Sequence, residues 1–345
     1  MRKIWRKGFV TVIFFLFVFL AVNQSGSIAY HIAGLKEETW ATKETGVFGE
    51  GEDSIDPNQL PQDQQALYFR IKEEAQRLRI APIDAKLDPI WKAIPGLNGR
   101  EVDIDRTFQL ASRQRQVNSI PFIFKEIPPN ITLDDLGAQP IYKGNPGKPM
   151  VSLMINVAWK EENIPGMLQT LREEKVKATF FFLGSWLKEH PEAARQIAAD
   201  GHELSNHAYS HADMTRLSDG RAKDEIMLTQ QLLESTFGVE NKLFAPPSGD
   251  YDMDTVRIAH ELGLKTVLWT IDTVDWKEPP AEAVVRKVAA RLEPGALILM
   301  HPTKAASGAL KGIIQEAKRK GLSLGTVSET LSPKRYTAVE TPLLF

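Results

Sequence analysis

Short apolar runs alternate with amphipathic segments in the second half of the chain. Each apolar run holds about four to seven residues, the length of a buried strand. The segments between them carry apolar residues at helical spacing, and several end at a glycine, which predicts helices. Strands are predicted at residues 151–157, 178–183, 242–245, 266–270, 296–300 and 322–326. Helices are predicted at residues 164–175, 191–200, 224–237, 255–262, 281–292 and 310–320.

This order of elements indicates the fold class. Repeated strand–helix–strand units form a parallel sheet with helices packed outside it, either as a barrel or as an open sheet. In a barrel, the reactive side chains lie at the carboxyl ends of the strands. We therefore predict an α/β fold whose functional residues follow its strands.

The residues before this pattern are organised differently. A first helix is predicted from apolar residues at helical spacing, namely Leu67, Ile71, Ala75 and Leu78. Six prolines between residues 121 and 149 mark a boundary. We predict a small mixed α/β unit at residues 61–140 and a larger domain at residues 148–332.

Basic residues lead directly into an apolar run at the N-terminus. Arg2, Lys3, Arg6 and Lys7 precede an apolar run at residues 9–22 that is broken only by Thr11. Such a run rises about 21 Å as a helix, short of the ~30 Å hydrocarbon core, and this order is typical of a secretory signal. Residues 1–29 are predicted to be a signal peptide or an uncleaved signal-anchor in the membrane, and the chain is exported in both cases. Residues 30–60 are predicted to be an acidic flexible linker.

The composition excludes several classes of site. The 345 residues include 42 basic and 44 acidic ones, a net charge of −2 that argues against a nucleic-acid partner. The chain has no cysteine, which excludes disulfides, thiol nucleophiles and Cys-ligated metals. A metal site would have to use His, Asp or Glu side chains.

Chemically competent side chains gather near the predicted strand ends. His207 and His211 are four residues apart, a spacing that places two imidazoles on one side of a helical turn, facing one metal ion. Asp272 follows one predicted strand and His301 ends another. A carboxylate and a histidine at neighbouring strand ends would form an acid–base pair.

In this order, the segments around these residues resemble the polysaccharide deacetylases, the NodB-homology domain of carbohydrate esterase family 4. The matching segments are Val151-Ser152-Leu153, Ala178-Thr179-Phe180-Phe181, Gly201-His202-Glu203, His207 to His211, residues 269–276 and Leu299-Met300-His301. The resemblance covers about residues 148–330. Residues 91–100 look like those of a sporulation-associated subgroup. The resemblance implies a distorted (β/α) barrel, preceded by the small mixed unit.

The resemblance also implies an activity. It implies metal-assisted hydrolysis of an N-acetyl group on a β-1,4-linked amino sugar, in peptidoglycan or another N-acetylated glycan. A divalent ion, zinc or similar, would be held by His207, His211 and one aspartate. His301 would be the general acid, tuned by Asp272. The apolar wall around the acetyl methyl group would be formed by Trp276 and Leu299.

Three positions depart from the family pattern. The first motif reads Met154-Ile155-Asn156-Val157-Ala158 where the family has Thr-Phe-Asp-Asp-Gly. The base position is therefore Asn156, which takes up no proton at neutral pH, and the third metal-ligand position is Val157, which has no donor atom. Ala245 stands where the family has an arginine that orients the base. The candidate replacement carboxylates are Glu161, Glu162, Asp250 and Asp252.

These departures predict weak or lost activity. A general base typically contributes about 10²–10⁴-fold, and two neutral imidazoles hold a dication poorly. Three hypotheses follow for the cell-wall or spore-wall glycan. The chain is a divergent but active deacetylase with a rearranged metal site, a catalytically silent glycan-binding protein, or a scaffolding protein in sporulation that uses residues 60–140 as its contact surface.

Overall fold

The computed structural model describes residues 55–113 and 120–335. The predicted signal segment, residues 1–29, and most of the predicted linker lie outside these ranges. The chain divides into two compact units, residues 1–65 and 66–345. The short helix η1 (Pro57–Gln59) belongs to the first unit. No helix within the described ranges is both long enough and apolar enough to cross a membrane.

The small elements before residue 148 are two helices and two antiparallel strand pairs. They are α3 (Gln62–Leu78), β1 (Lys86–Asp88) with β2 (Lys92–Ile94), β3 (Gly99–Val102) with β4 (Phe124–Ile127), and α4 (Ile104–Ser112). On α3 the predicted apolar face is buried at Ile71 and Ala75. Tyr68 of α3 packs edge-on against Phe108 of α4, with ring centroids 5.5 Å apart. The domain boundary that we predict between residues 140 and 148 remains a prediction.

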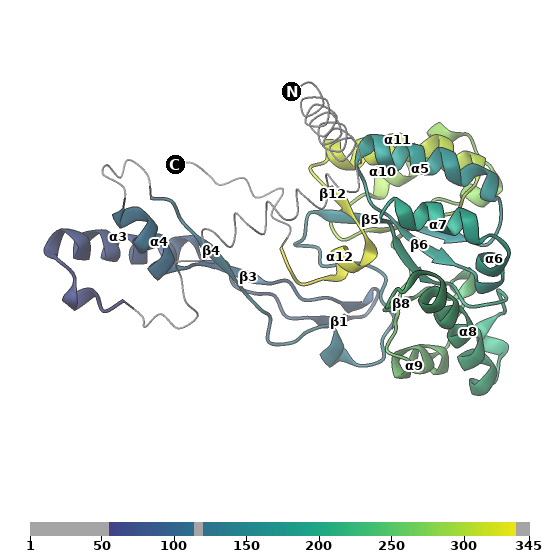
Figure 1. The fold of residues 1–345 in the computed structure, drawn as a ribbon, viewed down its shortest axis with the longest axis horizontal. Helices are drawn as coiled ribbons and strands as arrows, with labels where there is room; N and C mark the ends of the chain where they lie inside the picture. Colours follow the sequence, from purple (N-terminus) through teal and green to yellow (C-terminus); the bar gives the residue numbers. More distant parts are fainter. Residues whose placement is uncertain (1–54, 114–119, 336–345) are drawn as a thin grey trace, which may run out of the picture. The chain divides into compact units, whose positions relative to one another are not determined.

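The larger part is a curled parallel sheet of eight strands covered by helices (Figure 1). Seven strands follow the order β10-β11-β5-β6-β7-β8-β9, and β12 pairs with the first part of β5. The strands are β5 (Met150–Val157), β6 (Thr179–Phe182), β7 (Glu203–Asn206), β8 (Leu243–Phe244), β9 (Lys265–Thr266), β10 (Ile271–Asp272), β11 (Leu297–Met300) and β12 (Ser323–Gly325). This is the predicted distorted (β/α) barrel of the NodB type.

The predicted strand at residues 266–270 is wrong, and the difference explains how the sheet curls. Two short strands replace it, and β9 and β10 occupy opposite ends of the strand order. The connection between them crosses from one edge to the other. Ile141 pairs with this crossing, donating its N–H to Thr266 and accepting that of Leu268. No single strand spans the run because the partners change along it, from Phe244 at Val267 to Ile141 at Leu268 and Leu297 at Thr270.

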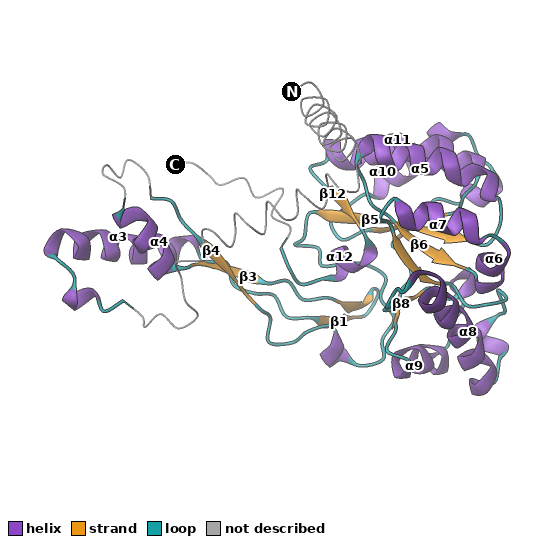
Figure 2. Cartoon of the chain, viewed as in Figure 1, coloured by secondary structure: helices purple, strands orange, loops and turns teal. Residues whose placement is uncertain are grey.

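Helices cover the outer face of the sheet (Figure 2). They are α5 (Ile164–Glu174), α6 (Gly184–Glu189), α7 (Pro191–Ala199), α8 (Asp219–Phe237), α9 (Met253–Glu261), α10 (Ala281–Arg291) and α11 (Lys304–Arg319), whereas α12 (Val327–Leu331) packs in the inner cluster. Alternate residues of β5 point to opposite faces, as in any strand. Ile155 and Val157 pack in the outer apolar layer under these helices, whereas Met154 packs in the inner cluster with Phe181. This alternation sends Asn156 toward the inside of the barrel.

Candidate active site

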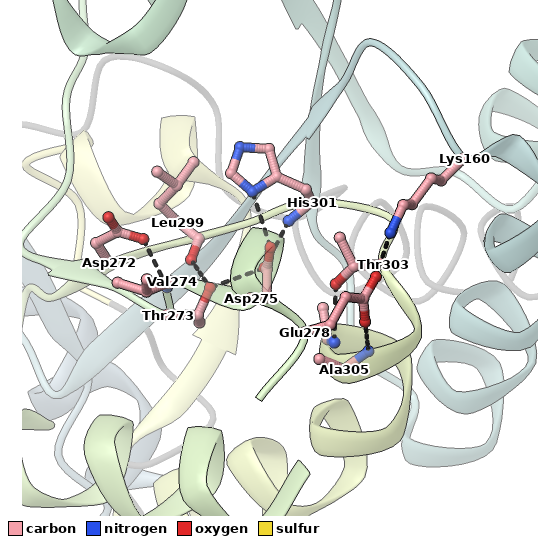
Figure 3. A network of polar contacts seen from close by, with 11 residues as sticks. Lys160, Asp272, Thr273, Val274, Asp275, Glu278, Leu299, His301, Thr303 and Ala305 are labelled. Atoms are coloured by element: carbon pink, nitrogen blue, oxygen red, sulfur yellow. Dashed lines mark hydrogen bonds and ion pairs between the residues drawn. The ribbon is translucent and has the colours of Figure 1, made fainter. Parts of the chain in front are cut away.

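His301 is held by a buried carboxylate at the carboxyl end of β11. Its Nδ1–H donates to Asp275 Oδ1 at 3.0 Å, and its backbone N–H donates to Asp275 Oδ2 at 2.8 Å (Figure 3). Asp275 is fully buried, and the Thr273 hydroxyl lies 2.8 Å from its Oδ2. A histidine fixed through Nδ1 presents Nε2 for proton transfer, which is the role of a general acid or base.

The carboxylate beside His301 differs from the predicted one. Asp272 accepts the backbone N–H of Val274 at 2.8 Å and so shapes the turn after β10, whereas Asp275 makes the contact with His301 (Figure 3). The strand register explains the difference. Asp272 is level with Leu299, so His301 lies further along the strand direction, where the chain after Val274 turns back toward it. The prediction that Asp272 tunes His301 is therefore corrected to Asp275.

The histidine pair lies in a loop, not on the predicted helical turn. Ala208 and His211 have left-handed backbone angles, with φ of 60° and 62°. The two imidazoles nevertheless come together, with ring centroids 5.4 Å apart at 76°. His207 donates Nδ1–H to the Ala245 carbonyl oxygen at 2.8 Å, which leaves the lone pair on Nε2. Burial lowers the pKa of His207 to about 3, so the ring is neutral at pH 7.

The third ligand that a metal would need is missing. Val157 is fully buried in the outer apolar layer, and Ala245 is buried in the inner cluster. Asn156 is 4% exposed, and its Oδ1 has no hydrogen-bond partner. Within residues 55–113 and 120–335, no group of three or more His, Asp or Glu side chains is placed to hold a metal ion. The described residues therefore do not fit the divalent ion that the resemblance implies.

Three of the four candidate replacement carboxylates have other contacts. Asp252 caps α9 by accepting the Thr255 N–H at 2.8 Å, and Asp250 follows the short helix η5 (Pro247–Gly249). Glu161 Oε1 lies 4.0 Å from His190 Nδ1, and Glu162 accepts from the Asn163 amide at 3.3 Å. Asp252 thus has a capping role, and none of the four belongs to a metal-binding group among the described residues.

A buried acid that the sequence analysis missed shapes the histidine loop. Glu225 of α8 is 8% exposed and accepts the N–H groups of Tyr209 and Ser210 at 3.0 and 2.7 Å. It also accepts the Ser210 hydroxyl at 2.6 Å. These three bonds fix the residues between His207 and His211. The sequence contained one signal for this residue, an acid on the otherwise apolar face of a predicted helix.

We expect Glu225→Gln to destabilise the fold. The amide keeps one acceptor oxygen for three donors, so part of the buried network loses its partner, at a cost of about 1–3 kcal/mol. Urea unfolding of the variant and the parent measures the loss. Glu234→Gln, at an exposed position on the same helix, is the matched control and should change stability by less than about 0.5 kcal/mol. Equal stabilities for the two variants would contradict this role of Glu225.

Trp159 is a second residue that sequence reasoning missed. Its ring stacks on His301, with centroids 5.1 Å apart and an interplanar angle of 26°. It comes two residues after β5 and is 36% exposed. The two predicted wall residues differ in exposure, because Leu299 is 3% exposed and Trp276 is 51% exposed. Their contact with an acetyl group remains a prediction.

Known proteins and a family model are similar to this chain. Residues 143–267 match the family model for polysaccharide deacetylase. The chain is 39% identical to the uncharacterized protein YlxY of Bacillus subtilis, over 78% of this chain and 84% of that protein. It is 30% identical to a peptidoglycan-N-acetylglucosamine deacetylase of Bacillus cereus, over 61% of this chain and 83% of that protein.

A solved structure is also similar. BA3943 of Bacillus anthracis, described as a family 4 carbohydrate esterase pseudoenzyme, superposes with a TM-score of 0.72 and 39% identity. The match covers 78% of this chain and 96% of that one. A BA3943 mutant described as having restored enzymatic activity superposes equally well, at 38% identity. The chain belongs to the polysaccharide deacetylase family.

Proposed function

We propose that this chain is a catalytically weak or silent polysaccharide deacetylase homologue that binds N-acetylated amino-sugar glycan of the cell wall. The observation that carries the proposal is the pair of residues at the end of β5. By the family resemblance, an amide stands at the base position and a buried valine at the metal-ligand position, although the two histidines are still assembled. Without the base and the metal ligand the chain lacks the groups that hydrolyse the amide bond, but it keeps the side chains that would surround a bound sugar.

The relatives support both parts of this proposal, the glycan ligand and the weak or lost catalysis. The Bacillus cereus relative acts on peptidoglycan N-acetylglucosamine, which makes that sugar the first ligand to test. BA3943 is described as a pseudoenzyme, so a silent member of the family has precedent. The basic and apolar N-terminal segment supports export, which would bring the chain to the wall. We also propose that the chain acts during sporulation, as its resemblance to a sporulation-associated subgroup suggests.

The test measures binding and catalysis in parallel. Purified full-length protein is incubated with peptidoglycan and with N-acetylglucosamine oligomers, with added Zn²⁺ or Co²⁺, and both retained protein and released acetate are quantified. We expect retention, and acetate release at least about 10²-fold below that of the Bacillus cereus relative, because the general base is missing. Metal-dependent release that disappears in His207→Ala would contradict the silent assignment. Absence of retention on either glycan would contradict the binding role.

A further inference from the structure

Two exposed tryptophans flank His301 at the carboxyl edge of the sheet. Trp159 follows β5 and Trp276 follows β10, and these two strands lie on either side of β11, which ends one residue before His301. The side chains are 36% and 51% exposed. The Trp159 indole contacts the His301 ring. The Trp276 ring centroid lies 4.8 Å from the Lys277 ammonium group, and both indoles leave apolar surface open to a ligand.

An ion pair and a hydrogen bond stabilise the loop that carries Trp159. Lys160, the next residue, has a left-handed backbone with φ of 60° and forms an ion pair with Glu278. Glu278 in turn accepts the Ala305 N–H at the start of α11, at 3.1 Å (Figure 3). Three segments, the β5 loop, the β10 loop and the first turn of α11, are thus linked through one carboxylate. Trp159 is consequently held against His301 by the chain on its C-terminal side.

An open groove begins at this ion pair. It has a volume of about 970 Å³, and its lining includes Lys160, Asn163, Glu278, Pro280 and Ser307. Both charge signs, an amide and a hydroxyl line it, so the groove carries donors and acceptors without a dominant charge. A neutral, hydroxyl-rich chain suits such a lining better than an ion does.

We propose that Trp159 is a sugar-stacking residue that holds a pyranose ring on its indole face opposite His301, with the rest of a neutral glycan chain running along the Lys160–Glu278 groove. This inference rests on the proposed function. One face of a β-linked hexosamine presents axial C–H groups, which pack on an indole face, while its edges carry hydroxyl and acetamido groups for hydrogen bonds. Trp159 therefore determines which polymer is held, through ring shape and not through charge.

The experiment measures binding of a soluble N-acetylglucosamine hexamer to the full chain by calorimetry and by tryptophan fluorescence. Trp159→Ala is expected to weaken binding by about 10–100-fold, and Trp159→Phe, which keeps an aromatic face, by less than about 5-fold. Lys160→Met, which breaks the ion pair with Glu278, is expected to give an intermediate loss. Phe69→Ala on α3 is the control, because it removes an aromatic ring that is 50% exposed on a helix outside the parallel sheet.

The outcomes separate this inference from the proposed function. Binding by the parent with an undiminished affinity in Trp159→Ala would overturn the stacking role and leave the proposed function intact. No binding by the parent would overturn both. Affinity that falls steeply with added salt would show that charge holds the ligand, which would also overturn the proposal. A thermal stability of Trp159→Ala equal to that of the parent, together with weaker binding, is the result we expect.

Discussion

Acetate release from N-acetylglucosamine oligomers is expected to rise by about 10²–10⁴-fold when Asn156→Asp, Val157→Asp and Ala245→Arg are combined in this chain. The first change supplies a carboxylate that takes up a proton, and the arginine orients it. The second supplies the third ligand, a carboxylate, that the site of His207 and His211 lacks, provided that the end of β5 turns the side chain at position 157 inward. Acetate assays with and without a chelator measure the gain.

Two controls make this result specific. His207→Ala in the restored background should remove the gained activity, and Asn156→Asp alone should gain little, because a base without the metal ligand set lacks the activated water. The Val157 side chain is fully buried in the outer apolar layer, so an aspartate there should lower stability by several kcal/mol unless the end of β5 turns it inward. A folded triple variant that binds Zn²⁺ and still releases no acetate would contradict the prediction.

The sequence predicted the architecture of the barrel and the positions of its motifs. Alternating strands and helices imply a parallel sheet, and parallel strands bring their carboxyl ends to one edge, so His207 and His301 had to lie near that edge. The apolar face of α3 at Ile71 and Ala75 also followed from spacing alone. These features depend on periodicity, which is a local property of the chain.

The errors concern contacts that depend on register and on backbone twist. Asp275 takes the place of Asp272 beside His301 because the pairing of β10 with β11 decides which residue is level with the imidazole. The loop at His207–His211 was predicted to be helical from the i, i+4 spacing of the two histidines. That spacing does not determine φ, and Ala208 has a positive φ, which no right-handed helical turn allows. Glu225 and Trp159 were missed because each contacts a segment distant in sequence. An acid on an apolar helix face marks Glu225 as unusual but does not identify its partners.

A buried histidine at the other end of the strands should make this fold sensitive to acid. His202 is 7% exposed, its Nδ1 accepts the Ala178 N–H at 3.2 Å, and its ring packs against Phe180. Burial, followed by the nearby charge of Lys177 and partly opposed by Asp200, lowers its pKa to about 4. The unfolded chain therefore binds a proton from about pH 6.5 downward, while the folded chain resists protonation until about pH 4.

Stability should consequently fall as the pH is lowered from 6.5 to 4, and His202 alone should account for about 3 kcal/mol of that loss. Urea unfolding at pH 7.0, 5.5 and 4.5 measures the slope for the parent and for His202→Asn, which keeps an acceptor near Ala178 but does not titrate. The variant should be less stable at pH 7 and should lose less stability on acidification. Because the carboxylates titrate alike in both proteins, the difference between the two slopes isolates His202. Parallel slopes would mean that the imidazole is protonated as easily in the folded chain as in the unfolded one, contrary to its burial beside Phe180.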